Sequence, residues 1–128
     1  MKIIVNKAKV ISDDERGQIV KLIDQDKFKI RAVLYITMNK GAVRANHYHT
    51  KDFHYVYCLS GKFKYYEKGL KKGSKMTSVT MKPREVVLTS PMVIHAMKAL
   101  EKSVFLAFTT EGRDPKKYEK EIIRTKII

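Results

Sequence analysis

The residues of this chain best suited to chemistry are its four histidines, and their spacing suggests that they act together. His47, His49 and His54 fall within eight residues, and His95 is the only other histidine among 128 residues. Residues two apart on an extended chain point to the same face, so the imidazoles of His47 and His49 should be neighbours. His54 joins them only if a bend or bulge intervenes. Converging imidazoles are typical of a metal site.

Three interpretations fit such a cluster. An all-histidine site for His47, His49, His54 and His95 suits a divalent transition metal (zinc, nickel, iron, manganese or copper) better than magnesium or calcium. A metal without carboxylate ligands keeps its full positive charge and acts as a Lewis acid. Alternatively, His49 and His47 are catalytic acids or bases and need no metal, because imidazole titrates near neutral pH. The third possibility is that the histidines are only hydrogen-bonded within the fold.

The charge of the chain bears on its partners. Lysine and arginine total 27 against 13 aspartate and glutamate, which gives a net charge of +14. A field of this sign attracts phosphate-bearing ligands. The basic residues are spread along the chain without a dense block, and no motif that reads a nucleic-acid groove accompanies them. We therefore expect a small-molecule substrate that carries phosphate, and we do not expect nucleic-acid binding.

Length and composition predict a single domain over residues 1–128. The hydrophobic fraction of 44% is typical of a globular chain. No apolar run approaches the length needed to span a membrane, and the N-terminal residues are too few and too charged for a signal peptide. A single cysteine, Cys58, excludes an internal disulfide and fits a reducing compartment. We expect a cytoplasmic protein that does not associate with a membrane.

Hydrophobic patterning predicts an all-β fold. About ten short strand-like runs are separated by turn signals, which is typical of an antiparallel sandwich or barrel. These runs cover residues 2–5, 8–11, 18–23, 28–38, 53–59, 62–67, 75–81, 86–89, 93–100 and 103–110. Residues 28–38 alternate most clearly, with the even-numbered positions on one face. Asp114 and Pro115 predict the N-cap and first residue of a short helix that ends near Ile123.

The histidine stretch resembles the first motif of the cupins. That motif is Gly, five residues, His-x-His, four residues, an acidic ligand, six residues and Gly, and it matches from Gly41 to Gly61 with His54 at the acidic position. Residues 84–95 resemble the second motif, with His95 at the fourth ligand position. The resemblance implies a double-stranded β-helix, or jelly-roll barrel, with a metal held by the four histidines.

Three further segments resemble cupins that act on deoxysugar nucleotides. They are Asp-Glu-Arg-Gly at 14–17, Arg-Ala-Asn-His-Tyr-His at 44–49 and the segment 111–118. The relatives are the 3,5-epimerases, the 3,4-ketoisomerases and the C3-epimerase domain of capsular polysaccharide synthesis; the last usually has glycine where this chain has Ala45. The resemblance implies an isomerase or epimerase of a nucleotide-linked keto-deoxysugar.

The same resemblance suggests residues that bind the substrate. Arg44 and Arg16 are candidates for gripping the pyrophosphate, because guanidinium groups match phosphate oxygens. Tyr57 and Tyr35 are candidates for proton donation or for stacking on the base. We also expect a homodimer formed through the N-terminal strands.

Two other functions remain open from the sequence. An all-histidine metal site with free positions could bind oxygen, which would make the protein a non-haem metal-dependent oxygenase on a small organic substrate. A non-catalytic ligand-binding cupin is the other alternative, because no acid and base pair can be named from the sequence. The identity of the metal and the presence or absence of product would distinguish these functions.

Overall fold

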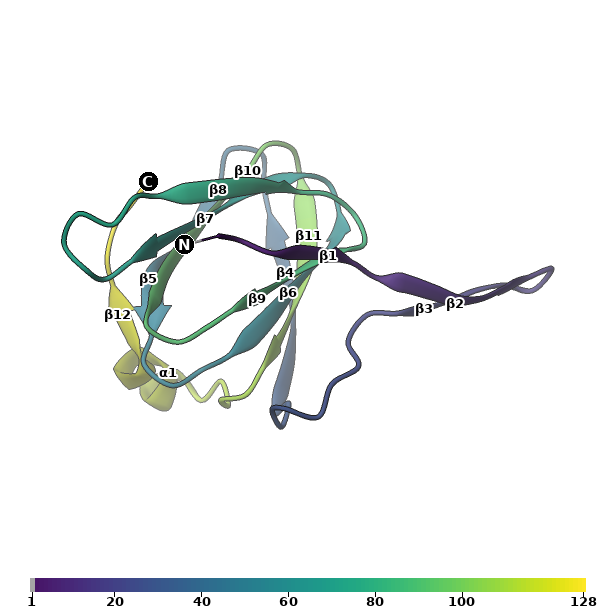
Figure 1. Ribbon diagram of the computed structural model, residues 1–128, viewed down its shortest axis with the longest axis horizontal. Helices are drawn as coiled ribbons and strands as arrows, with labels where there is room; N and C mark the ends of the chain where they lie inside the picture. The colour runs from purple at the N-terminus through teal and green to yellow at the C-terminus, as the bar shows by residue number, and fades with distance from the viewer. Residues whose placement is uncertain (1) are drawn as a thin grey trace.

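The computed structural model describes residues 2–128, which form twelve strands and one short helix (Figure 1). One sheet contains, in spatial order, β1 (Val5–Lys7), β9 (Glu85–Thr89), β6 (His54–Ser60), β11 (Ser103–Thr109) and β4 (Ala32–Met38). The other contains β12 (Ile122–Arg124), β5 (Val43–His49), β10 (Val93–Ala99), β7 (Phe63–Gly69) and β8 (Thr77–Met81). Strands β2 (Lys9–Asp14) and β3 (Gly17–Lys21) form a separate hairpin. The predicted all-β jelly-roll barrel with a short C-terminal helix is confirmed.

The two sheets face each other across an apolar core. Strand β11 shows why the sheet forms here, since Ser103, Phe105, Ala107 and Thr109 alternate as buried residues with half-buried ones between them. This period of two is that of a strand with one face on a core. The core draws on both sheets and includes Met38, Val56, Cys58, Phe63, Tyr65, Met81, Val87, Met97 and Phe105.

The helix and its flanks agree with the prediction at one end and differ at the other. Helix α1 (Pro115–Glu121) begins as expected, with the Asp114 side chain accepting hydrogen bonds from the backbone N–H groups of Lys116 and Lys117. It ends earlier than predicted, because Ile122–Arg124 become β12 and pair with β5. Ile122 is 4% exposed, so burial of its side chain against the barrel outweighs one more helical turn.

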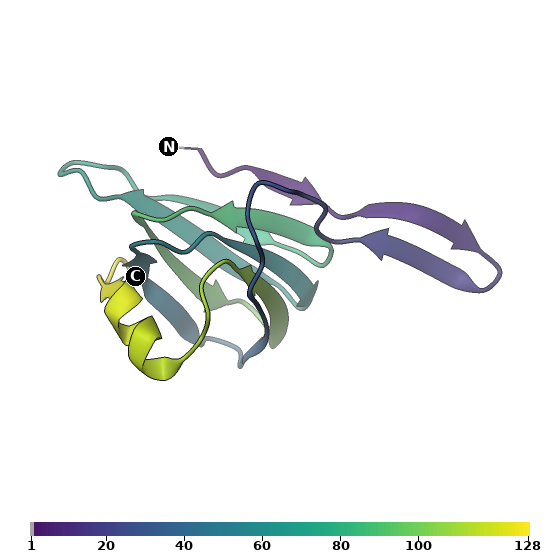
Figure 2. The same ribbon diagram turned by 90° about the horizontal axis from the view of Figure 1, so that it is seen from below.

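Two other boundaries differ from the prediction. The strand expected from residue 28 begins at Ala32, and the strand expected at residues 2–5 begins at Val5. The hairpin β2–β3 projects away from the barrel, as Figure 2 shows. Its apolar side chains Ile11 and Ile19 are 55% and 59% exposed, because no part of the described barrel covers them. No helix in the described part of the chain is long and apolar enough to cross a membrane.

Candidate functional site

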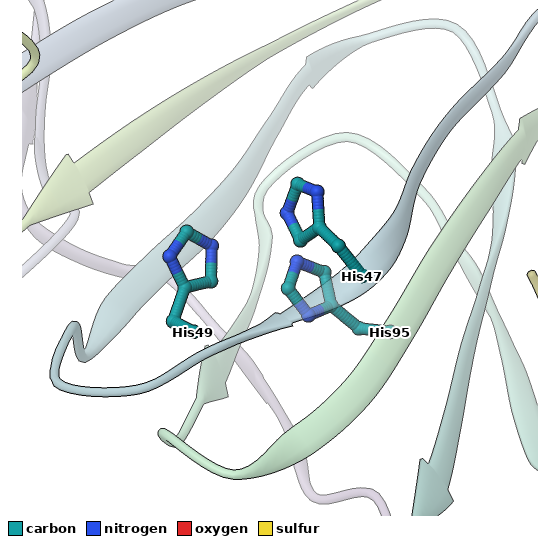
Figure 3. A group of neighbouring side chains, drawn as sticks. All are labelled: His47, His49 and His95. Carbon is teal, nitrogen blue, oxygen red and sulfur yellow. The ribbon is translucent and has the colours of Figure 1, made fainter. Parts of the chain in front are cut away.

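The structure brings the four histidines together inside one end of the barrel. The ring centroids of His47 and His95 are 4.8 Å apart, those of His49 and His54 are 4.9 Å apart, and those of His54 and His95 are 5.1 Å apart. All four side chains are buried. Figure 3 shows the rings of His47, His49 and His95 pointing toward one another from two strands.

Strand pairing explains this convergence. His47 on β5 lies directly opposite His95 on the neighbouring β10. His54 enters from the other sheet, at the first residue of β6. The register of β5 and β10 shifts next to His95, and Ala45 and Asn46 both have positive φ, at 68° and 55°. Glycine adopts such angles without a steric cost from a Cβ atom, so this bulge is a position where glycine would be less strained than Ala45.

Two carboxylates contact the Nδ1 atoms of two of the histidines. The Nδ1 atom of His49 lies 2.5 Å from Oε1 of Glu121, at the end of α1. The Nδ1 atom of His54 lies 3.0 Å from Oδ2 of Asp52. A carboxylate on Nδ1 favours the tautomer with a proton there, which leaves the Nε2 lone pair free. For His49 this nitrogen can accept a proton or bind a metal, and the Nε2 atom of His54 likewise faces away from its carboxylate.

Asp52 is a buried residue whose hydrogen bonds connect several groups at this end of the barrel. Its carboxylate accepts hydrogen bonds from the backbone N–H groups of Thr110 and Glu111 at 2.9 and 3.1 Å, and from Nη2 of Arg113 at 3.0 Å. Burial alone would raise the pKa of Asp52. The hydrogen bonds and positive charges of His54 and Arg113 lower this pKa well below its usual range, so the group stays ionised.

Three histidines of the cluster, His47, His49 and His95, are neutral near pH 7. Burial, together with the charges of His49 and His54, lowers the pKa of His47 to about 3. Burial also lowers the pKa values of His49 and His95, and the carboxylate of Glu121 only partly opposes this at His49. The Nδ1 atom of His47 is buried without a hydrogen-bond partner among residues 2–128. An unpaired buried nitrogen is costly, which suggests that a ligand completes the site.

A cavity of about 180 Å³ opens beside the cluster. Its polar lining consists of the four histidines together with Arg44, Arg113 and Tyr118, and the rest is mostly apolar. Arg44 donates hydrogen bonds from Nε and Nη2 to the backbone oxygen of Thr37, at 3.1 and 3.0 Å. Arg44 is thus the one predicted substrate-binding residue that the structure brings to this cavity.

The other three predicted substrate-binding residues lie elsewhere. In β4 the even-numbered residues face the core, so Tyr35 points outward and is 66% exposed. In β6 the face shared by His54 and Val56 points inward, so Tyr57 packs with Ala8 and Val86 on the outer side of the sheet. Arg16 lies at the tip of the hairpin, where it pairs with Asp14 and its side chain is 81% exposed. Within one chain, none of the three reaches the histidine cluster.

Sequence reasoning missed four residues of the site: Asp52, Arg113, Tyr118 and Glu121. Asp52 had a local signal, since it stands two residues before His54. Glu121 had none, because 72 positions separate it from His49 and only the docking of α1 joins them. Arg113 and Tyr118 lie in the segment that resembles the tail of the deoxysugar-nucleotide cupins, but nothing in that segment indicates which side chains turn inward.

The family model described as FdtA: WxcM-like, C-terminal matches residues 1–124. The chain belongs to this family. No curated protein matches it in sequence. Among solved structures it is similar to QdtA, a sugar 3,4-ketoisomerase from Thermoanaerobacterium thermosaccharolyticum determined in complex with TDP. The identity is 26%, the match covers 96% of this chain and 88% of QdtA, and the TM-score is 0.77.

Two more distant structures show the same fold and no more than that. WlaRA from Campylobacter jejuni, a TDP-fucose-3,4-ketoisomerase, is 18% identical with a TM-score of 0.77, and the match covers 96% of this chain and 89% of that one. The dTDP-4-dehydrorhamnose 3,5-epimerase from Sulfolobus tokodaii is 20% identical with a TM-score of 0.74, over 90% of this chain and 73% of that one. The predicted resemblance to deoxysugar-nucleotide cupins is confirmed.

Replacing Asp52 by asparagine should destabilise the fold strongly. The change removes the negative charge that Arg113 and His54 share and leaves buried donors poorly matched, at a cost of about 3 kcal/mol. Asp24→Asn is the control, because Asp24 forms an exposed pair with Lys21 whose loss should cost about 0.5 kcal/mol or less. Urea unfolding followed by circular dichroism measures both. Equal stability of the two variants would contradict the role of Asp52.

Proposed function

We propose that the protein is an isomerase of a nucleotide-linked 4-keto-6-deoxysugar, of the 3,4-ketoisomerase type. The observation that carries this proposal is the buried, neutral His49 imidazole, held by Glu121 beside a small cavity. The prediction of an enzyme of sugar-nucleotide metabolism is supported by QdtA, of which one variant was determined in complex with TDP-4-keto-6-deoxyglucose.

The reaction begins when a well-placed base removes a proton from the sugar. A ketone at C4 acidifies the hydrogen on C3, and a base that removes this proton generates an enediolate. Nε2 of His49 would be that base, because its lone pair is free while Nδ1 is paired with Glu121. Glu121 would stabilise the imidazolium that forms, as a carboxylate does behind a catalytic histidine. Return of the proton to C4 completes the shift of the carbonyl group to C3.

We expect only part of the substrate to enter the cavity, because the cavity is small. A cavity of about 180 Å³ is smaller than the 300–1,000 Å³ usual for drug-sized ligands. The sugar ring would therefore enter, and the diphosphate and nucleoside would lie at the mouth. Arg44 would bind the diphosphate, since a guanidinium has five donors and the bonds to Thr37 use only some of them. The net charge of +14 would draw the anionic substrate in.

The first test of this function is turnover of dTDP-4-keto-6-deoxyglucose, followed by proton NMR. We expect a 3-keto product from the wild type, and about 100-fold or more slower turnover in His49→Gln, because the general base is lost. Tyr48→Phe is the control, since Tyr48 lies between His47 and His49 on the opposite face of β5. Unchanged turnover in His49→Gln contradicts the mechanism. Tight binding without product in the wild type would favour the non-catalytic ligand-binding cupin.

A metal-dependent variant of the site is a second candidate. Ligand nitrogens of His47, His49 and His95 all lie within 4.8 Å of one another, and the unpaired Nδ1 of His47 is consistent with a missing ligand. Carboxylates behind imidazoles, as at His49 and His54, are typical of metal sites. The donor set fits zinc, nickel, iron, manganese or copper. When bound, such an ion would polarise the substrate carbonyl as a Lewis acid.

Metal content decides between the two versions of the site. If the cluster is a metal site, elemental mass spectrometry of untagged protein should find about one equivalent of metal, lost in His47→Ala and retained in Tyr48→Phe. Absence of metal after adding it back would contradict the metal centre and leave the histidines as acids and bases. Iron or copper accompanied by oxygen uptake would instead favour the metal-dependent oxygenase.

We also propose that the protein is a homodimer. The outward side of the sheet that ends in β4 exposes Val33 at 59% and Tyr35 at 66%, and the hairpin exposes Ile11 and Ile19. Exposed apolar side chains on these two elements are consistent with a protein interface. The projecting hairpin is the natural contact with a second copy (Figure 2). In such a dimer, Arg16 at the tip of the hairpin could contribute only to the site of the second copy.

Charged residues in the hairpin should dissociate this dimer. Ile11→Asp combined with Ile19→Asp places two like charges in the apolar contact, so light scattering after size-exclusion chromatography should give a monomer where the wild type gives a dimer. The control is Leu70→Asp, a residue 42% exposed in the loop after β7. A monomeric wild type at micromolar concentration would contradict the proposal.

A further inference from the structure

Helix α1 turns only two side chains toward the barrel, and one of them has no assigned role. Of its seven residues, Tyr118 and Glu121 are partly buried, while the other five are exposed. Residues three apart lie on the same side of a helix, so the contact of Glu121 with His49 carries Tyr118 to the cavity. The Tyr118 ring centroid lies 6.1 Å from that of His49 and 6.4 Å from that of His47.

The ring of Tyr118 is held in place while its hydroxyl is left free. The guanidinium carbon of Arg113 lies 4.8 Å from the ring centroid, and Arg113 is itself fixed by its 3.0 Å hydrogen bond to Asp52. Among residues 2–128, no protein group forms a hydrogen bond with the Tyr118 hydroxyl. A partly buried phenol normally has such a partner, and because Tyr118 lines the cavity, a ligand bound there can supply it.

The isomerisation needs a proton donor in addition to a base. When the proton leaves C3, negative charge develops on the oxygen at C4, and later the hydroxyl on C3 must lose its proton. A guanidinium group offers hydrogen-bond donors but is not a proton carrier, so Arg44 and Arg113 do not fill this role. In the described chain, Tyr118 is the cavity residue other than the histidines that can donate a proton and take it back. Burial raises the pKa of Tyr118, so the hydroxyl stays protonated before reaction.

We propose that Tyr118 is a catalytic residue that shuttles a proton between the two oxygens of the substrate, an inference that rests on the proposed isomerase function. In the first half, His49 takes the proton from C3, the C3–H electron pair becomes the C3–C4 double bond, and Tyr118 gives its hydroxyl proton to the oxygen on C4. In the second half, His49 returns its proton to C4, and the Tyr118 phenolate takes the proton from the oxygen on C3. Both residues end as they began, and nothing else is consumed.

Tyr118→Phe tests this role, because phenylalanine keeps the ring on which Arg113 stacks and removes only the hydroxyl. We expect kcat on dTDP-4-keto-6-deoxyglucose to fall about 100-fold with KM roughly unchanged, since general acid–base groups typically contribute 10²–10⁴-fold. The matched control is Tyr66→Phe on the outer face of β7, whose ring has the Lys64 ammonium 5.4 Å from its centroid. This control should keep wild-type kcat.

Reaction in deuterium oxide separates the two halves of the chemistry. We compare two rates in Tyr118→Phe with those of the wild type: the exchange of the C3 hydrogen in recovered substrate and the formation of product. Exchange should slow less than product formation, because product formation also requires the second half of the reaction, which needs the phenolate. A kcat within threefold of wild type overturns the proposal, and so does a rise in KM with unchanged kcat, which would mean binding alone. Absence of turnover by the wild type would refute the proposed function itself, whereas active wild type with active Tyr118→Phe refutes only the role of Tyr118.

Discussion

The site depends on two buried carboxylates that each bind the back of an imidazole. Asp52 joins His54 to Arg113 and to the backbone of Thr110 and Glu111, so it holds the start of β6 against the segment that leads to the helix. Glu121 joins α1 to His49. A buried charge is tolerated only when hydrogen-bonded partners surround it, and here those partners are the groups that close one end of the barrel.

These pairings orient the histidines as well as the chain. The Nδ1 atoms of His49 and His54 face carboxylates, so the Nε2 atoms of both rings face away from those acids. Desolvation keeps His47, His49 and His95 neutral, although the carboxylate of Glu121 lies beside His49. The same arrangement suits proton abstraction and metal binding, because both need an imidazole with a fixed, available lone pair.

Helix α1 supplies side chains that complete the site at one end of the barrel. Its seven residues bring the phenol of Tyr118 to the cavity and the carboxylate of Glu121 to the Nδ1 atom of His49. Arg113 is hydrogen-bonded to Asp52 and stacks on Tyr118, while Glu121 contacts His49, so these side chains belong to one connected unit. Their relative positions are therefore fixed before any substrate binds, which is the condition for efficient acid–base chemistry.

Local spacing in the sequence determined the parts of this protein that depend on neighbouring residues. The His-x-His pair shares a face because strands have a period of two, and Asp114 followed by Pro115 starts a helix because the cap needs no distant partner. Motif spacing also placed His54 and His95 in the same predicted site. Tertiary structure alone decided which tyrosines lie at the cavity. Tyr35 and Tyr57 fall on the outer sides of their strands, while Tyr118 turns inward with Glu121. The reason is that local patterns set which residues share a face, whereas only packing between distant segments decides which of those faces meets the cavity.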